Sequence, residues 1–184
     1  MKTRITRSLV TATFALSTVL LAGSQLALAD ANQTLVDKVR SGTLRYLNIN
    51  TAFADGFVTA TPCVSGPDQG AMGVHLVLPS RLDSGDTSGD QPQALIYEPK
   101  NDGSMRLVGV EFIVLAQVWA KQHHPAGGVP VVEGLLMNYV GAPNRYGLPA
   151  FYELHVWAWQ YNPQGSFADW NTQVTCVHQA APAS

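Results

Sequence analysis

Short strand-like segments separated by turn residues dominate this chain, and a single helical segment precedes them. From Thr34 to Phe53 apolar side chains recur at helical intervals, which predicts one amphipathic helix. Six strand-like runs follow, at Gly73 to Leu78, Ala94 to Tyr97, Leu107 to Val114, Val129 to Met137, Phe151 to Trp159 and Gln173 to Val177. This order predicts an α+β fold, in which one N-terminal amphipathic helix is followed by a mainly antiparallel curled sheet or half-barrel of about six strands.

Turn signals define some of the connections between these segments. Asn101-Asp102-Gly103 predicts a hairpin between two of the strands. The stretch from Asp83 to Gln93 is rich in Asp, Ser, Gly and Pro, which predicts an exposed loop. Residues 114–119 fit either the end of a strand or a short helix.

The first residues have the pattern of a cleavable signal peptide. Lys2, Arg4 and Arg7 precede an apolar stretch from Leu9 to Ala22, and Ala27-Leu28-Ala29 supplies the small-x-small pattern of a cleavage site. We therefore expect residues 1–29 to be removed and residues 30–184 to form a single exported globular domain. A retained N-terminal anchor is the alternative.

The charge of the expected mature chain disfavours two classes of partner. Residues 30–184 contain eight Lys and Arg against thirteen Asp and Glu, a net charge of −5. Nucleic acids and anionic membranes both require basic patches, so neither is an expected partner. No later apolar segment approaches the roughly 20 residues of a spanning helix, so we do not expect the mature chain to insert in a membrane.

The chain contains only two cysteines, Cys63 and Cys176. An even number of cysteines in an exported protein predicts a disulfide bond. Metal ligation by the same pair is the weaker alternative, because the two thiols lack the close spacing of a zinc knuckle.

Ionisable side chains inside otherwise apolar strands are the candidates for chemistry. The chain has no nucleophile-elbow, phosphate-loop, dinucleotide or His-Glu-x-x-His motif. It does have His75, Glu98, Glu111, Glu153 and His155 within or beside strand-like runs. A buried carboxylate needs a cation, a protonated partner or a metal, because burying it unpaired is costly.

These residues predict a metal site. Strand alternation places Glu153 and His155 on one face, and we expect His75, Glu98, Glu111 and His155 to be metal ligands. Mixed nitrogen and oxygen donors favour Zn, Mn, Fe or Ni. If the protein is an enzyme, the site suits metal-assisted hydrolysis or oxidation. The alternative is a solvated or structural role for the His and Glu residues, for which Arg106 and Arg145 are available counter-ions.

Tryptophans supply a second hypothesis. Trp157, Trp159 and Trp170 could stack on a sugar ring or an apolar ligand, which would make the protein a binding module without catalysis. Packing in the core and at its rim is the alternative for the same side chains. A structural protein of the cell envelope is a third hypothesis.

Several sequence motifs together resemble a family of exported bacterial proteins of unknown function. They are Pro62-Cys63-Val64-Ser65-Gly66-Pro67, Gly70-Ala71-Met72-Gly73-Val74-His75, Tyr97-Glu98-Pro99, Leu107-Val108-Gly109-Val110-Glu111-Phe112, Asn144-Arg145-Tyr146-Gly147-Leu148-Pro149, Phe151-Tyr152-Glu153-Leu154-His155-Val156-Trp157 and Phe167-Ala168-Asp169-Trp170-Asn171. The resemblance implies a periplasmic or extracellular location and names no activity. It also implies that the positions within these motifs, both cysteines included, are the first to test. Thr172 departs from the proline expected after the last motif.

Overall fold

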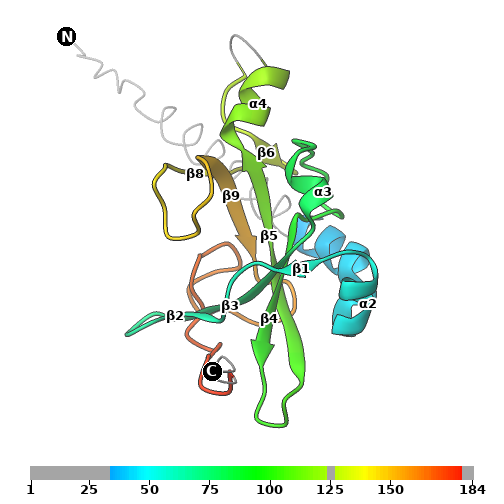
Figure 1. The fold of residues 1–184 in the computed structure, drawn as a ribbon, viewed down its shortest axis with the longest axis vertical. Coiled ribbons are helices and arrows are strands. Elements are labelled where there is room, and N and C mark those ends of the chain that lie inside the picture. Colours follow the sequence, from blue (N-terminus) through cyan, green and yellow to red (C-terminus); the bar gives the residue numbers. More distant parts are fainter. Residues whose placement is uncertain (1–33, 124–126, 180–184) are drawn as a thin grey trace, which may run out of the picture.

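The computed structural model of the protein describes residues 34–123 and 127–179. The predicted signal peptide, residues 1–29, lies outside the described residues. In Figure 1 the long strands cross near the centre, the N-terminal helical segment lies to the right in blue and cyan, and the C-terminal segment lies at the lower left in orange and red. None of the helices in the described ranges has both the length and the apolar character needed to cross a bilayer.

An antiparallel sheet of seven strands forms the centre of the molecule, in the order β1-β3-β4-β5-β9-β8, with β2 paired to β3. The strands are β1 (Val58–Thr59), β2 (Val64–Gly66), β3 (Gly70–Val77), β4 (Ala94–Pro99), β5 (Met105–Leu115), β8 (Asn138–Val140) and β9 (Phe151–Val156). A separate two-stranded hairpin consists of β6 (Val131–Val132) and β7 (Leu135–Leu136). The order begins at β1 and ends at β8, so the described sheet is open. The predicted α+β class with a mainly antiparallel sheet is confirmed.

The N-terminal helical segment is divided into three pieces. Residues 34–43 are helical, and the 3-10 helix η1 (Leu44–Leu47) and the helix α2 (Ile49–Ala54) follow. Asn48 separates the last two in an extended conformation, and its side chain accepts a hydrogen bond from the Asn50 N–H, as a helix N-cap does. Gly42 allows the backbone of Asp90 to approach so closely that a Cβ at this position would collide with it.

Two further short helices flank the sheet, α3 (Pro79–Leu82) and α4 (Ala116–Gln122). Of residues 114–119, for which a strand end and a short helix were both possible, the first two end β5 and the other four belong to α4. The hairpin predicted at Asn101-Asp102-Gly103 is confirmed, because β4 and β5 pair on either side of it. Its Gly103 has a φ of 80°, a conformation that favours glycine.

One face of the sheet packs against the N-terminal helical segment and forms the main core. Leu35 and Val39 of the helical segment belong to the same cluster as Leu76, Leu95 and Phe112 of the central strands, and all five are fully buried or nearly so. The Tyr97 hydroxyl donates a hydrogen bond of 2.7 Å to the Tyr46 carbonyl, which joins β4 to η1. The apolar side of the helical segment and the apolar residues on one face of the strands therefore pack together in this layer.

The opposite face of the sheet carries two smaller apolar clusters. The first contains Ile96 and Trp157, and the second contains Ala94, Ile113 and Phe151. By strand register the polar residues of the central strands lie between these clusters, since His75 pairs with Ile96 and Glu111 pairs with Ala94.

A disulfide joins Cys63, just before β2, to Cys176 near the end of the described chain, which confirms the predicted pairing. The strand predicted at Gln173 to Val177 is wrong, because residues 172–179 consist of turns and irregular backbone. The reason is local, as the Thr175 N–H donates to the Glu98 carboxylate rather than to a neighbouring strand. The disulfide is compatible with an exported protein.

Candidate metal centre

His75, Glu111 and His155 come together on the second face of the sheet, from three different strands. Glu111 of β5 lies opposite His155 of β9 in the antiparallel register. His75 of β3 reaches the pair across β4, where the residue opposite Glu111 is the small Ala94. Strand alternation places Glu153 two residues before His155 on the same face, as the sequence predicted.

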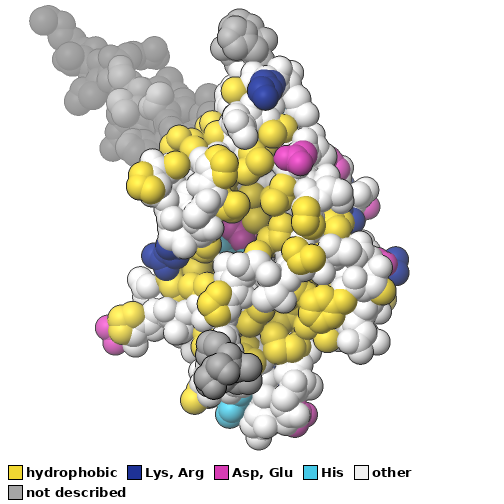
Figure 2. Space-filling view, in the orientation of Figure 1, with side chains coloured by type: hydrophobic (Ala, Val, Ile, Leu, Met, Phe, Trp, Pro, Cys, Tyr) yellow, Lys and Arg dark blue, Asp and Glu magenta, His cyan; other side chains and the backbone are white. Residues whose placement is uncertain are grey.

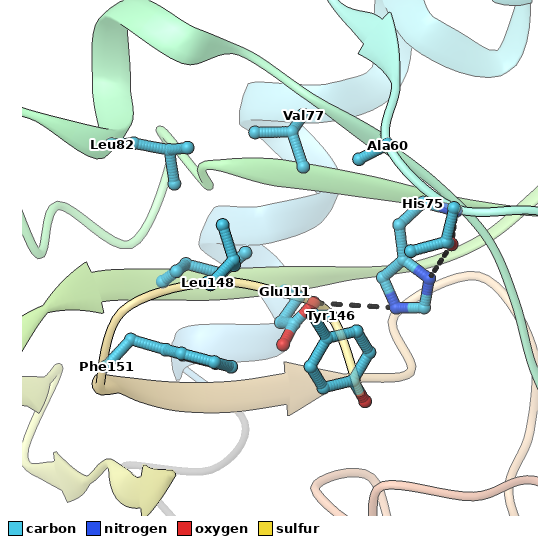
Figure 3. Close-up of a pocket in the computed structure, with 10 residues that line it drawn as sticks. Ala60, His75, Val77, Leu82, Glu111, Tyr146, Leu148 and Phe151 are labelled. Carbon is cyan, nitrogen blue, oxygen red and sulfur yellow. Dashed lines mark hydrogen bonds and ion pairs between the residues drawn. The ribbon is translucent and has the colours of Figure 1, made fainter. Parts of the chain in front are cut away.

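The distances within this cluster suit ligands of one cation. The nearest potential donor atoms of His75, Glu111 and His155 all lie within 4.8 Å of one another. His75 Nε2 is 3.5 Å from Glu111 Oε2, a contact drawn in Figure 3. Two ligand atoms about 2.1 Å from a cation and related by the tetrahedral angle lie about 3.4 Å apart. This pair therefore already has the spacing of metal ligands.

Burial shifts the pKa of all three groups in the direction that favours the neutral form. Burial lowers the pKa of His75 to about 4, and a hydrogen bond to the Gly73 backbone opposes the shift only in part. Burial, with a smaller contribution from His75, lowers the pKa of His155 to about 3. The pKa of Glu111 is raised well above its usual range by burial and then by the adjoining Glu153 carboxylate. The His75–Glu111 contact is therefore not an ion pair at neutral pH.

Three imidazole nitrogens in the cluster lack hydrogen-bond partners. His75 Nε2 and both ring nitrogens of His155 are buried without a hydrogen-bond partner among the described residues. The His155 side chain is 0% exposed, so bulk solvent does not reach it. Buried polar atoms in proteins almost always have partners, and an unmatched buried group calls for a ligand or a functional explanation. Neutral imidazole nitrogens are also common metal ligands.

A second set of donors shares His155 with the first. Glu153, His155 and Asp169 also offer ligand atoms within 4.8 Å of one another. His155 Nδ1 is 3.8 Å from Asp169 Oδ1, which comes from the irregular C-terminal segment. Burial raises the pKa of both Glu153 and Asp169. Two further carboxyl groups therefore adjoin the His75, Glu111 and His155 cluster.

Thr61 orients the His75 ring from the strand connection after β1. Its Oγ1 lies 3.2 Å from His75 Nδ1 and accepts a hydrogen bond of 3.3 Å from the His75 backbone N–H. The contact engages Nδ1, which leaves Nε2 directed at Glu111, as Figure 3 shows. A hydrogen bond at one ring nitrogen is the usual way in which proteins fix the orientation of a metal-binding histidine.

Glu98 does not belong to this cluster, although we predicted it as a ligand. Its Oε2 lies 2.7 Å from Arg106 Nη2 and 3.3 Å from Lys100 Nζ, and its Oε1 accepts a hydrogen bond from the Thr175 N–H. Both carboxylate oxygens are therefore engaged. Glu98 is therefore paired with counter-ions, which was the alternative to metal binding for the His and Glu residues. Its partner Arg106 lies opposite it across the β4–β5 hairpin.

The three tryptophans of the second hypothesis have separate surroundings. Trp157 is only 3% exposed, and its indole N–H donates to the Ala168 carbonyl. The Trp159 indole N–H donates to Thr43 Oγ1 at 3.0 Å, which links it to the N-terminal helical segment. Trp170 is partly buried, with the Arg145 guanidinium 5.7 Å from its ring centre. The buried ring of Trp157 is not available for stacking on an external sugar.

Asp169 and Tyr146 are site residues that sequence reasoning did not single out. Tyr146 stands beside Glu111 in Figure 3, and it comes from the loop between β8 and β9. Both residues lie in irregular segments, where no periodicity assigns a side chain to a face. The only signal was their presence in the motifs Asn144-Arg145-Tyr146-Gly147-Leu148-Pro149 and Phe167-Ala168-Asp169-Trp170-Asn171.

No family model, curated protein or solved structure matches this chain.

Proposed function

We propose that this protein is exported to the periplasm or the medium and binds one divalent cation through His75, Glu111 and His155. The observation that carries the proposal is the group of three unpartnered imidazole nitrogens, buried beside a carboxyl group. Leaving them unmatched costs free energy. A cation would satisfy His75 Nε2 and one ring nitrogen of His155, and the other His155 nitrogen would be left to a second partner, for which Asp169 is 3.8 Å from Nδ1.

The donor set narrows the choice of cation. Two imidazoles and one carboxylate suit Zn, Mn, Fe or Ni, whereas calcium prefers oxygen ligands only and Cu(I) prefers sulfur. Both imidazoles are held neutral by burial, which is the protonation state that binds a metal. Glu111 can bind a cation only as the carboxylate, so its raised pKa makes cation binding weaker as the pH falls.

Three protein ligands support a role beyond structure. Structural zinc sites are closed by four protein ligands, whereas catalytic sites keep a position open for water or substrate. Glu153 and Asp169 adjoin the cluster and could accept a proton or a hydrogen bond from a bound ligand. This arrangement serves metal-assisted hydrolysis and oxidation alike.

The test is the metal content of the mature protein, purified untagged from an exported expression without chelator. We expect about one equivalent of a transition metal by elemental mass spectrometry. The His75→Ala/His155→Ala double variant should contain none while keeping its near-ultraviolet circular dichroism.

Glu98→Gln is the matched control, because it replaces another buried glutamate on the same sheet and should keep the metal. A metal-free wild-type protein that also fails to bind added Zn, Mn, Fe, Co or Ni would refute the proposal. Equal metal content in the wild type and in the folded double variant would refute it as well.

A further inference from the structure

A small cavity adjoins the cluster on the second face of the sheet. Its volume is about 150 Å³, and His75 and Glu111 form part of its wall. Apolar side chains supply most of the remaining lining, among them Val77, Ile113 and Phe151. Figure 3 shows His75 and Glu111 together at one end, with Val77, Leu82, Leu148 and Phe151 extending away from them. The cavity therefore has one polar end and one apolar end.

Strands, a short helix and a loop all contribute side chains to the apolar part of the cavity wall. Val77 and Ile113 belong to the central strands, Leu82 belongs to α3, and Leu148 belongs to the loop that precedes β9. Ala60, which has an exposed side chain, also lines the cavity. In Figure 2 the colours of acidic and histidine side chains are visible in a hollow among apolar side chains. The His75 and Glu111 side chains are 4% and 6% exposed, so a small part of the polar end meets the surface.

The volume sets the size of the occupant. Cavities of about 150 Å³ lined by aliphatic and aromatic side chains accommodate a benzene molecule. An apolar body as large as one six-membered ring therefore fits beside Ile113 and Phe151. Longer or fused-ring molecules would have to extend out of the cavity.

Charge sets the chemistry of the other end of the occupant. A divalent cation with two imidazole ligands and one carboxylate ligand has a formal charge of +1, which the adjoining Glu153 and Asp169 reduce when they are ionised. The open position of such a cation favours a ligand with an anionic oxygen donor. His75 and Glu111 both line the cavity, so a cation that they hold is adjacent to whatever fills it.

We propose that the cavity binds a small aromatic carboxylic acid, with its ring among Val77, Ile113 and Phe151 and its carboxylate on the cation at His75, Glu111 and His155. This inference rests on the metal centre proposed above. The substrates of that centre are then single-ring aromatic acids, and the apolar wall of the cavity selects for the ring.

The experiment uses three probes on the metal-loaded mature protein, whose metal content is measured first. Benzoate carries both parts of the expected ligand, acetate carries only the carboxylate, and benzene carries only the ring. Isothermal titration calorimetry should show benzoate binding at least about tenfold more tightly than acetate, because the buried ring adds its transfer free energy. In the metal-free protein benzene should still bind, and benzoate should bind no more tightly than benzene.

Cavity-filling variants provide the second readout. Leu148→Trp and Leu82→Trp place a larger side chain in the cavity from two different segments, so the test does not depend on one variant folding. Both should keep the metal and the affinity for acetate while losing the preference for benzoate. Leu136→Trp is the control, because this leucine is 67% exposed and does not line the cavity.

The outcomes separate the two proposals. Normal metal content with equal affinities for acetate and benzoate would overturn the aromatic-acid inference and leave the metal centre standing. Benzoate binding that survives both filling variants would also overturn it. Absence of metal binding would overturn the centre itself, and the inference with it.

Discussion

Glu111 on β5 and His155 on β9 face each other across an antiparallel strand pair, and both side chains are buried on the same face of the sheet. The same pairing would bring together two apolar residues in an ordinary core. Here it brings together a carboxyl group whose pKa is raised by burial and an imidazole whose pKa is lowered by burial.

The two buried glutamates Glu98 and Glu111 should respond differently to the same substitution. Glu111→Gln should weaken metal affinity by more than the roughly 10- to 100-fold that loss of a ligand's hydrogen-bond partner costs. Its effect on the stability of the metal-free protein should be small, because burial raises the pKa of Glu111 and so disfavours the charged form that the substitution removes. A competitive titration with a chelating dye measures the affinity. An unchanged affinity would remove Glu111 from the ligand set.

Glu98→Gln should instead destabilise the fold and leave metal affinity unchanged. The substitution removes the charge that pairs with Arg106 and that holds the Thr175 N–H. We expect a loss of about 1–3 kcal/mol in the free energy of unfolding, measured by urea denaturation. A loss of metal binding in a folded Glu98→Gln protein would show that Glu98 contributes to the centre after all.

Thr61 should tune metal affinity without being a ligand. Thr61→Val preserves the shape of the side chain and removes the oxygen 3.2 Å from His75 Nδ1. Metal affinity should fall by about 10- to 100-fold. Thr61→Ser restores the hydroxyl and should recover most of the loss. If valine and serine have the same affinity, the contact does not orient the histidine.

The metal-free protein should lose stability as the pH falls below about 6.5. An unfolded histidine takes up a proton near its ordinary pKa of 6.5, whereas folded His75 and His155 do so only near 4 and 3. Between these values the unfolded state binds more protons, so acidification favours unfolding by up to about 1.4 kcal/mol per pH unit for each histidine. Glu111, Glu153 and Asp169, whose folded pKa values are all raised, contribute in the opposite direction above their ordinary pKa values, so the histidine contribution has to be isolated with a variant.

Urea denaturation of the wild type and of His155→Phe at several pH values isolates the histidine contribution. The variant keeps a buried aromatic ring and removes one titrating group. Its stability should therefore decline less steeply on acidification than that of the wild type. Parallel pH profiles for the two proteins would contradict the neutral, buried state of His155.

Reduction of the Cys63–Cys176 disulfide should destabilise the protein substantially. The bridge spans 113 residues, and closing a loop of that size stabilises the fold by up to about 4.7 kcal/mol in the chain-entropy model. The measurement is urea denaturation with and without a thiol reductant. The Cys63→Ser/Cys176→Ser variant should match the reduced protein and show no further change on reduction.

Strand alternation was sufficient to predict part of the candidate site. The run from Phe151 to Trp157 placed Glu153 and His155 on one face, and the register confirms it. His75 and Glu111 were recognised as polar residues in apolar strands. Their meeting with His155 depends on the order β3-β4-β5-β9, in which β9 lies beside β5 although β6, β7 and β8 intervene in sequence. Periodicity describes each strand alone and does not determine that order.

Glu98 shows how the same sequence signal can have a different cause. Like Glu111, it is a glutamate at an apolar strand position, but the Asn101-Asp102-Gly103 hairpin brings Arg106 opposite it. That pairing is short in sequence and follows from the turn, so local reasoning could have separated the two glutamates. Asp169 could not be found this way, because its position depends on an irregular segment held by the disulfide and by Asn171, which pairs with Ala71.

The disulfide also affects the stage of folding at which the proposed centre can bind a cation. Cys63 lies two residues after Thr61, which orients His75, and Cys176 lies seven residues after Asp169. The two sides of the proposed centre are therefore joined by a bond that forms under oxidising conditions and only after Cys176 has been synthesised. If the centre assembles only once this bond is made, the proposed cation comes from the compartment in which the disulfide forms.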